Sequence, residues 1–139
     1  MSSAEGENAV AAARKNLAGV RVLVVEDAWH VAKALKSTLE DMGMCVAGPV
    51  ARIAEAKHLL DKEVPDLAVV DVNLKGEMAY DLIGELHDRG VRVIVVSGYA
   101  VLPSSLDKAA AILQKPFSGS ALLTTLQQVM KDKNLRVSN

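Results

Sequence analysis

Carboxylates, a hydroxyl and an ammonium group follow short apolar runs at four places in this sequence. These side chains are Glu26, Asp27, Asp71, Ser97 and Lys115. Three carboxylates brought close together repel one another, so they stay ionised only beside a compensating cation. Hard oxygen ligands suit Mg²⁺ or Mn²⁺, and a carboxylate can itself act as a nucleophile that forms an aspartyl phosphate. In that chemistry the metal, the lysine and the hydroxyl would hold the oxygens of the transferred phosphoryl group.

Each of these residues alone has an ordinary structural explanation. Acidic residues at strand ends often only form turns or cap helices, Lys115 alone would be a surface lysine, and Ser97 alone a turn residue. Their joint occurrence at four strand ends favours a site. Nucleotide binding has little support, because the sequence contains neither a G-x-x-x-x-G-K-[ST] loop nor a G-x-G-x-x-G turn.

The apolar runs that precede these residues are short and rich in β-branched residues, as in strands covered on both faces. The predicted strands are Val20–Val25, Cys45–Ala47, Leu67–Val70, Val91–Val96 and Ala111–Leu113. Between them, apolar residues recur with helical spacing, as at Leu35 and Leu39. Residues 103–110 have room for barely two turns, so we expect a short or irregular fourth helix. Gly43, Gly90 and the Gly48-Pro49 pair are placed where elements should end.

Alternating strands and helices predict an α/β fold, a flavodoxin-like (βα)5 doubly wound parallel sheet with strand order 2-1-3-4-5. Ligands of such sheets bind beyond the C-terminal ends of the strands, where the polar residues follow. We expect one domain over residues 20–133. Residues 1–19 would be a tail, disordered or a short helix, and residues 134–139 a C-terminal tail.

Composition excludes several functional classes. Half of the 139 residues are hydrophobic, which excludes wholesale disorder. The net charge of -1 includes no basic excess, so we expect no nucleic-acid partner. No apolar run is long enough to span a membrane and no signal peptide is visible, which predicts a cytoplasmic protein without a membrane partner. The single cysteine, Cys45, excludes an intramolecular disulfide and is expected to be buried.

Residues 20–131 resemble the receiver domain of two-component response regulators. The resemblance is carried, in order, by VLVVEDAWHVAKAL, DLAVVDVNLKGEMAYDLIGEL, VIVVSGYA and LQKPF. It implies that Asp71 is the phosphoacceptor and that Ser97 and Lys115 contact the phosphoryl group. It further implies a cis peptide bond between Lys115 and Pro116.

The same resemblance implies a divalent metal site. Glu26 and Asp27 would be the metal-side acidic pair, with Asp27 a direct ligand. Asp71 and the backbone carbonyl of Asn73 would complete the protein ligands, and the ion would be Mg²⁺ or Mn²⁺.

Two features depart from ordinary receivers. Ile112 stands where these carry Tyr or Phe, and the stretch from Ser97 to Lys115 is shorter than usual. Both resemble a subgroup of stand-alone receivers, linked to alphaproteobacterial sensor kinases, with an NLxGE segment and a TGY-like turn. These segments read NLKGE at residues 73–77 and SGY at residues 97–99.

Two aromatic side chains, Tyr99 and Trp29, have competing interpretations, and the three histidines have a single one. Tyr99 either replaces the missing aromatic switch or is an exposed turn tyrosine. Trp29 either caps the metal site or contacts a partner, or it covers the first turn of its helix. The histidines are expected on the surface of different helices; they are His30, His58 and His87.

The resemblance implies a single-domain receiver in a His-to-Asp phosphorelay. A sensor histidine kinase or a histidine phosphotransfer protein would donate phosphate to Asp71, and the output would be a protein contact or a phosphate sink. It would not be a conventional enzyme, but we expect Mg²⁺-dependent autophosphorylation and autodephosphorylation. The alternative is a non-phosphorylated receiver-like adaptor, which is disfavoured because no site residue is missing. A hydrolytic phosphatase with an aspartyl-phosphate intermediate is also disfavoured. Such an enzyme usually has a second acidic residue two positions after the nucleophile as the general acid/base, and here that position is Asn73.

Overall fold

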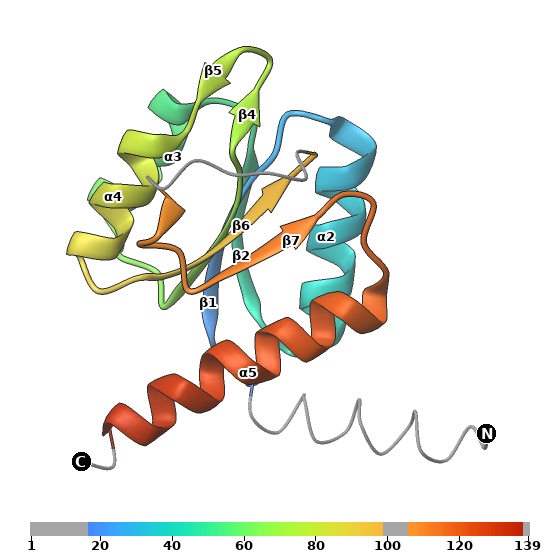
Figure 1. The fold of residues 1–139 in the computed structure, drawn as a ribbon, viewed down its shortest axis with the longest axis vertical. Coiled ribbons are helices and arrows are strands. Elements are labelled where there is room, and N and C mark those ends of the chain that lie inside the picture. Colours follow the sequence, from blue (N-terminus) through green and yellow to red (C-terminus); the bar gives the residue numbers. More distant parts are fainter. Residues whose placement is uncertain (1–16, 99–105, 138–139) are drawn as a thin grey trace.

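Five parallel strands form the sheet at the centre of the molecule, in the order β2-β1-β3-β6-β7. The computed structural model describes residues 17–98 and 106–137 of the chain. The strands of this sheet are β1 (Arg21–Val25), β2 (Cys45–Val50), β3 (Leu67–Asp71), β6 (Arg92–Ser97) and β7 (Ala111–Gln114). Counted along the chain, this is the order 2-1-3-4-5, and the predicted flavodoxin-like α/β fold is confirmed (Figure 1).

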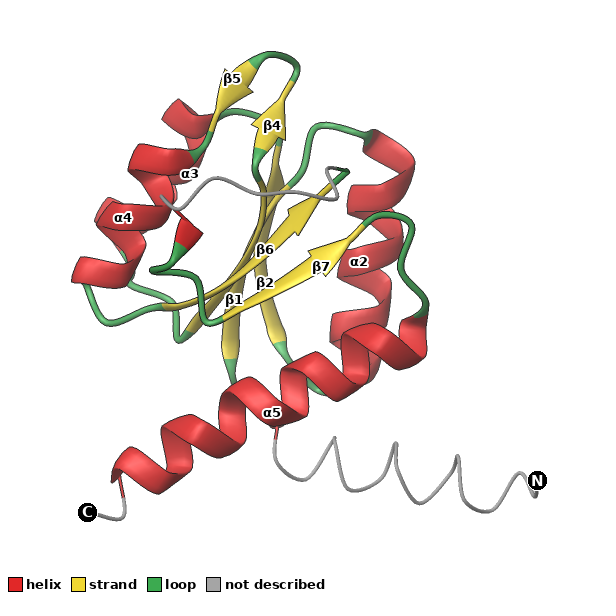
Figure 2. Cartoon of the chain, in the orientation of Figure 1, coloured by secondary structure: helices red, strands yellow, loops and turns green. Residues whose placement is uncertain are grey.

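Among the described residues, two α-helices cover each face of the sheet (Figure 1, Figure 2). They are α2 (Trp29–Asp41) and α5 (Gly119–Val137) on one face, and α3 (Ile53–Lys62) and α4 (Tyr80–Asp88) on the other. Side chains of β1 alternate between the two layers. Val22 and Val24 pack with α2 and α5, whereas Leu23 and Val25 pack with α3 and α4. Because helices cover the central strands on both sides, the sequences of these strands are almost continuously apolar.

The connection between β6 and β7 matches the expectation of a short or irregular fourth helix. No α-helix occurs in its described part, which is residue 98 and residues 106–110. Leu106 is nevertheless buried and packs in the same apolar cluster as the α4 side chains Leu82 and Leu86. This connection therefore contributes to the core although it supplies no α-helix there.

Strand β2 differs from the prediction in two ways, because it is an edge strand. It continues through the Gly48-Pro49 pair to Val50, so this pair does not end the element as expected. The register with β1 shifts at this point, and Gly48 adopts a φ of 89°. A Cβ at this position would lie 2.9 Å from the carbonyl oxygen of Val24, so both the conformation and the close approach favour glycine. The prediction that Cys45 is buried is wrong, since it is exposed at the start of this edge strand.

Described residues on both sides of the expected 20–133 domain take part in the fold. Leu17, placed in the tail by its sequence, is fully buried and packs in the cluster that α2 and α5 share. The amide of Gly19 donates a hydrogen bond of 2.9 Å to the carbonyl of Gly43, which attaches this segment to the turn after α2. At the other end α5 continues to Val137, past residue 133. None of the helices in the described part of the chain is both long and apolar enough to cross a bilayer.

Candidate functional site

Three carboxylates meet where β1 and β3 end. Glu26 follows β1 directly, and its amide donates a hydrogen bond of 2.9 Å to the carbonyl of Val50, so the bulged end of β2 holds its backbone. Asp71 is the last residue of β3 and pairs with Val96 of β6. One carboxylate oxygen from each of Glu26, Asp27 and Asp71 lies within 4.8 Å of the others. The predicted acidic cluster therefore forms.

Lys115, which follows the edge strand β7, contacts two of these carboxylates. Its Nζ lies 2.8 Å from Oε1 of Glu26 and donates a hydrogen bond of 2.9 Å to Oδ2 of Asp71. The Lys115-Pro116 peptide bond is cis, as the resemblance implied. The amide of Lys115 also donates a hydrogen bond of 2.7 Å to the carbonyl of Ser97, which attaches the lysine to the end of β6.

Burial makes the charges of this cluster interdependent. Glu26 is 3% exposed and Asp71 6%. The pKa of Glu26 is raised, mainly because the carboxylate is buried. The contact with Lys115 and the hydrogen bond from the amide of Ala28 lower this pKa in part, whereas the negative charge of Asp71 raises it further. For Lys115, burial lowers the pKa, but the contacts with Glu26 and Asp71 outweigh it and the pKa is raised. Lys115 therefore stays protonated and compensates one of the three carboxylates.

The donor set fits a hard divalent cation. When all three carboxylates are ionised, Lys115 leaves two negative charges without compensation, and a divalent ion supplies that charge. Oε2 of Glu26 accepts a hydrogen bond of 3.0 Å from the amide of Ala28. Buried Oε1 forms the ion pair with Lys115 but, within the described residues, accepts no well-aligned hydrogen bond. All the candidate ligand atoms are oxygens, which suits Mg²⁺ or Mn²⁺. Glu26, Asp27 and Asp71 could therefore hold such an ion.

Asn73 lies next to the phosphoacceptor candidate, in a hairpin that the sequence did not predict. Strands β4 (Asn73–Leu74) and β5 (Glu77–Met78) pair antiparallel. The amide of Asn73 donates a hydrogen bond of 3.0 Å to Oδ1 of Asp71, and its own Oδ1 accepts one of 2.7 Å from the amide of Gly76. Lys75 and Gly76 form the turn with φ values of 52° and 89°. An Asn and a Gly so close together were the only sequence signal for this turn.

The remaining candidates occupy different positions. Ser97 is fully buried at the end of β6, beside the end of β7. Tyr99 lies outside the described residues. Trp29 is 73% exposed, and Nζ of Lys33 lies 5.0 Å from the centre of its ring. The prediction that the histidines lie on the surface is confirmed for all three, His30, His58 and His87.

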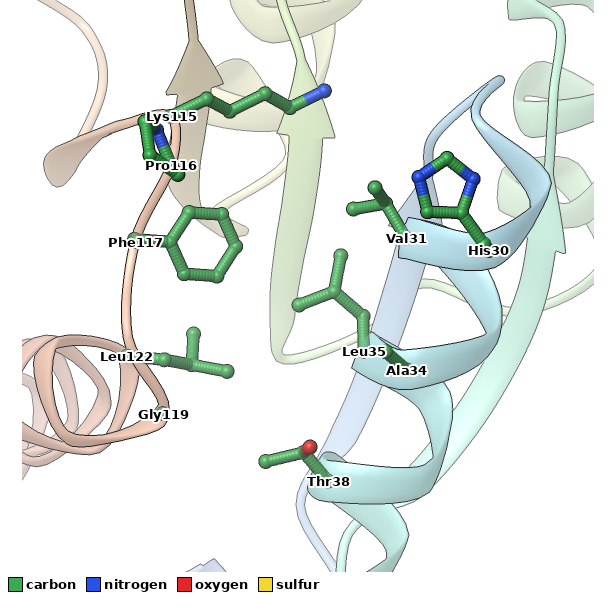
Figure 3. Close-up of a pocket in the computed structure, with 10 residues that line it drawn as sticks. All are labelled: His30, Val31, Ala34, Leu35, Thr38, Lys115, Pro116, Phe117, Gly119 and Leu122. Atoms are coloured by element: carbon green, nitrogen blue, oxygen red, sulfur yellow. The ribbon is translucent and has the colours of Figure 1, made fainter.

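A mainly apolar pocket of about 560 Å³ opens beside Lys115, between α2 and the segment 115–122. Figure 3 shows Phe117 and Leu122 on one side and Val31 and Leu35 on the other. Sequence reasoning missed this pocket, because its two walls are far apart along the chain.

The sequence that carries these residues matches a known family. The family model described as the response regulator receiver domain matches residues 22–127. The chain belongs to the response regulator receiver domain family. The receiver domain is 30% identical over 119 residues to the chemotaxis protein CheY of Thermotoga maritima, a match that covers 81% of this chain and 99% of that protein.

Longer relatives match the receiver over part of their length. It is 28% identical over 131 residues to the C4-dicarboxylate transport transcriptional regulatory protein DctD of Pseudomonas aeruginosa, covering 88% of this chain. It is 29% identical over 116 residues to the alginate biosynthesis transcriptional regulatory protein AlgB of Pseudomonas putida, covering 78% of this chain. The receiver spans 28% of the first protein and 26% of the second, so about a quarter of each.

Two solved structures share both fold and 26% sequence identity with the receiver. A CheY-like receiver domain protein from Methanospirillum hungatei superimposes with a TM-score of 0.77, and the match covers 86% of this chain and 99% of that one. A response regulator protein from Burkholderia pseudomallei, solved with a phosphorylated aspartic acid, calcium ion and citrate, gives a TM-score of 0.69 over 84% of this chain and 72% of that one.

Proposed function

We propose that this receiver domain accepts a phosphoryl group on Asp71 from a phosphohistidine, in a Mg²⁺-dependent reaction of a His-Asp phosphorelay. The observation that carries the proposal is the position of the Asp71 carboxylate, which lies in a three-carboxylate cluster and is hydrogen-bonded to Lys115. The phosphorylated aspartic acid of the similar Burkholderia pseudomallei protein supports it. A receiver-like adaptor without phosphorylation would have no need for this set of groups.

The reaction is a transfer between two nucleophiles. A carboxylate oxygen of Asp71 attacks the phosphorus, and the phosphorus–nitrogen bond of the donor breaks. The other ring nitrogen of the donor phosphohistidine carries a proton before transfer, so the ring takes the electron pair of the broken bond and leaves as neutral imidazole. Lys115, now on Oδ2 of Asp71, would move its hydrogen bond to a phosphoryl oxygen, and the hydroxyl of Ser97 would donate another. Mg²⁺ held by Glu26, Asp27, Asp71 and the carbonyl of Asn73 would offset charge on the phosphoryl oxygens.

The donor would be a sensor histidine kinase or a histidine phosphotransfer protein, and we place its docking surface over the apolar pocket. The pocket opens beside Lys115 (Figure 3). Because Lys115 contacts Asp71, a helix seated in the pocket would bring its histidine toward Asp71. Ala34→Glu should therefore slow phosphotransfer from a donor protein that labels the wild type, and leave labelling by acetyl phosphate unchanged. Ser37→Glu is the control, since this exposed α2 residue does not line the pocket. Equal transfer to both variants would place the donor elsewhere.

The finer assignments follow from the same proposal. The NLKGE segment and the SGY sequence favour the stand-alone subgroup linked to alphaproteobacterial kinases, acting in the cytoplasm through a protein contact or as a phosphate sink. Tyr99, outside the described residues, is the switch candidate, because Ile112 offers no polar aromatic side chain and is 45% exposed on β7. Beryllofluoride stands in for the phosphoryl group, and we expect the largest NMR shifts outside the metal site in residues 97–110. Shifts concentrated in β7 would contradict this switch.

Incubation with acetyl phosphate and Mg²⁺, followed by intact-mass measurement, tests the proposal. We expect one phosphoryl mass increment in the wild type, which depends on Mg²⁺ and is absent from Asp71→Asn. A wild type that stays unmodified would support the adaptor instead. Undiminished labelling of Asp71→Asn would remove Asp71 as the phosphoacceptor.

A further inference from the structure

Glu77, the last residue of the NLKGE segment, connects the β4–β5 hairpin to helix α3. Its Oε1 accepts a hydrogen bond of 3.3 Å from the amide of Ile53, the first residue of α3. The first amides of a helix have no partner within the helix, and negative charge there is favoured by the helix dipole. Arg52, the N-cap residue, makes no side-chain cap. A carboxylate from a distant element therefore supplies the acceptor.

The other end of the hairpin reaches the phosphoacceptor. Glu77 pairs with Leu74, and Met78 pairs with Asn73. Asn73 in turn donates its amide to Oδ1 of Asp71 and closes the turn. The segment from Asp71 to Glu77 is thus one hydrogen-bonded unit, with the phosphoacceptor at one end and the contact with α3 at the other.

Packing and shape place this unit against both α3 and the metal site. Leu74 is 3% exposed and packs in the apolar cluster that Ile53 also contacts. A hollow of about 480 Å³ is lined by the metal-ligand candidate Asp27, by Arg52 before α3 and by Glu77 of the hairpin. The hairpin and the start of α3 therefore line the same hollow as Asp27.

We propose that Glu77 is a positioning residue for the metal site. By fixing the hairpin to α3, it holds the backbone of Asn73, whose carbonyl belongs to the proposed ligand set, beside Asp71. Glu77 itself touches neither the metal nor the phosphoryl group. The inference rests on the proposed function, since it concerns the same metal site, and it assigns a role to a motif residue that the phosphoryl chemistry leaves unused.

The chain offers a matched control in Glu55. This carboxylate lies in the first turn of α3 itself, and its Oε1 accepts a hydrogen bond of the same length, 3.3 Å, from the amide of Ala51. Both glutamates are exposed, so replacing either removes the same charge from the same helix end. Only Glu77 connects that end to the hairpin. Glu55→Ala therefore reports any effect of α3 stability or local charge alone.

Mg²⁺ titration calorimetry and amide hydrogen exchange of the unphosphorylated protein test the inference. Glu77→Ala should weaken Mg²⁺ binding by about fivefold, the size expected from the loss of one hydrogen bond, and should speed exchange of the Gly76 amide. Glu77→Gln should stay close to the wild type, because its amide oxygen accepts the same bond. Glu55→Ala should leave both readouts unchanged.

Three results would overturn the inference. They are wild-type Mg²⁺ affinity in Glu77→Ala, an equal loss in Glu55→Ala, and a Gln variant that behaves like the Ala variant. If the wild type gains phosphate while one of these results is obtained, only the role of Glu77 fails. A wild type that neither binds Mg²⁺ nor gains phosphate would instead refute the proposed function.

Discussion

Replacing Lys115 by methionine removes the cation that lies between two buried carboxylates. Nζ of Lys115 is 2.8 Å from Glu26 and 2.9 Å from Asp71, and the side chain of Glu26 is only 1% exposed. Methionine keeps most of the apolar stem, so the main change is electrostatic. In the metal-free protein the two carboxylates then face each other without compensation, and we expect the folded state to lose stability.

The magnitude follows from the burial of the partners. Removing one member of a buried ion pair costs about 3–5 kcal/mol, and we reduce this to about 2–3 kcal/mol because the side chain of Lys115 is 27% exposed to screening water. Proton uptake by Glu26 limits the loss at low pH. Because the folded-state pKa of Glu26 is raised above its unfolded value, the folded protein binds this proton more tightly. The variant should therefore lose stability as the pH rises from about 4.5, the unfolded value, through the raised folded pKa.

Mg²⁺ should reverse much of this loss. Removing a positive charge near a doubly charged ion tightens binding by about 1–2 kcal/mol at a water-like dielectric. Mg²⁺ at about 100 times its dissociation constant adds about 2.7 kcal/mol of stability. The variant should thus bind Mg²⁺ more tightly than the wild type, although its response to phosphate is impaired.

Urea unfolding followed by circular dichroism, with and without Mg²⁺, measures these effects. We expect the metal-free midpoint of Lys115→Met to fall by about 1 M. Lys131→Met is the control, because this lysine is exposed, and its midpoint should not change. A metal-free Lys115→Met as stable as the wild type, or one that binds Mg²⁺ more weakly, would refute the electrostatic reasoning.

Three further predictions concern other parts of the molecule. Asp27→Ala should weaken Mg²⁺ binding by at least about tenfold. Because Asp27 is partly exposed, the free energy of unfolding should stay within about 0.5 kcal/mol of the wild-type value. An unchanged Mg²⁺ affinity in calorimetry would remove Asp27 from the ligand set. Since burial raises the pKa of Glu26, protons compete with the metal above the ordinary carboxylate range, so Mg²⁺ affinity should fall as the pH falls through that raised pKa. Glu26→Gln should flatten this pH profile, and an unaltered profile would count against the assignment. Leu17→Ala should lower the free energy of unfolding by about 2–5 kcal/mol in a chemical denaturation experiment, because Leu17 is fully buried; a loss below about 1 kcal/mol would show that Leu17 is not part of the core.

The positions of the site residues could be predicted from the sequence because of how parallel sheets are built. Alternating strand and helix patterns determine a parallel sheet, and the carboxyl ends of its strands meet at one edge. Glu26, Asp71 and Lys115 each follow a predicted strand, so their meeting required no knowledge of distant contacts. In the structure Lys115 contacts Glu26 at 2.8 Å and Asp71 at 2.9 Å at this edge.

Other features depend on neighbours that the local pattern does not reveal. Cys45 was expected to be buried because its run is apolar, but β2 is an edge strand, and edge position depends on the topology of the whole sheet. The two-residue strands β4 and β5 are too short to show a period. The contact from Glu77 to Ile53 joins residues that are 24 positions apart in the sequence. Leu17 is buried only because α2 and α5 pack around it.

Borohydride reduction of the phosphorylated protein identifies the phosphoacceptor most directly. The reagent converts an aspartyl phosphate into homoserine and leaves an unmodified carboxylate unchanged, so peptide mass spectrometry locates the modified residue. After incubation with acetyl phosphate and Mg²⁺, we expect homoserine at position 71 and no homoserine when Mg²⁺ is omitted. Homoserine at Asp27 or at another carboxylate, with Asp71 intact, would contradict the proposed mechanism.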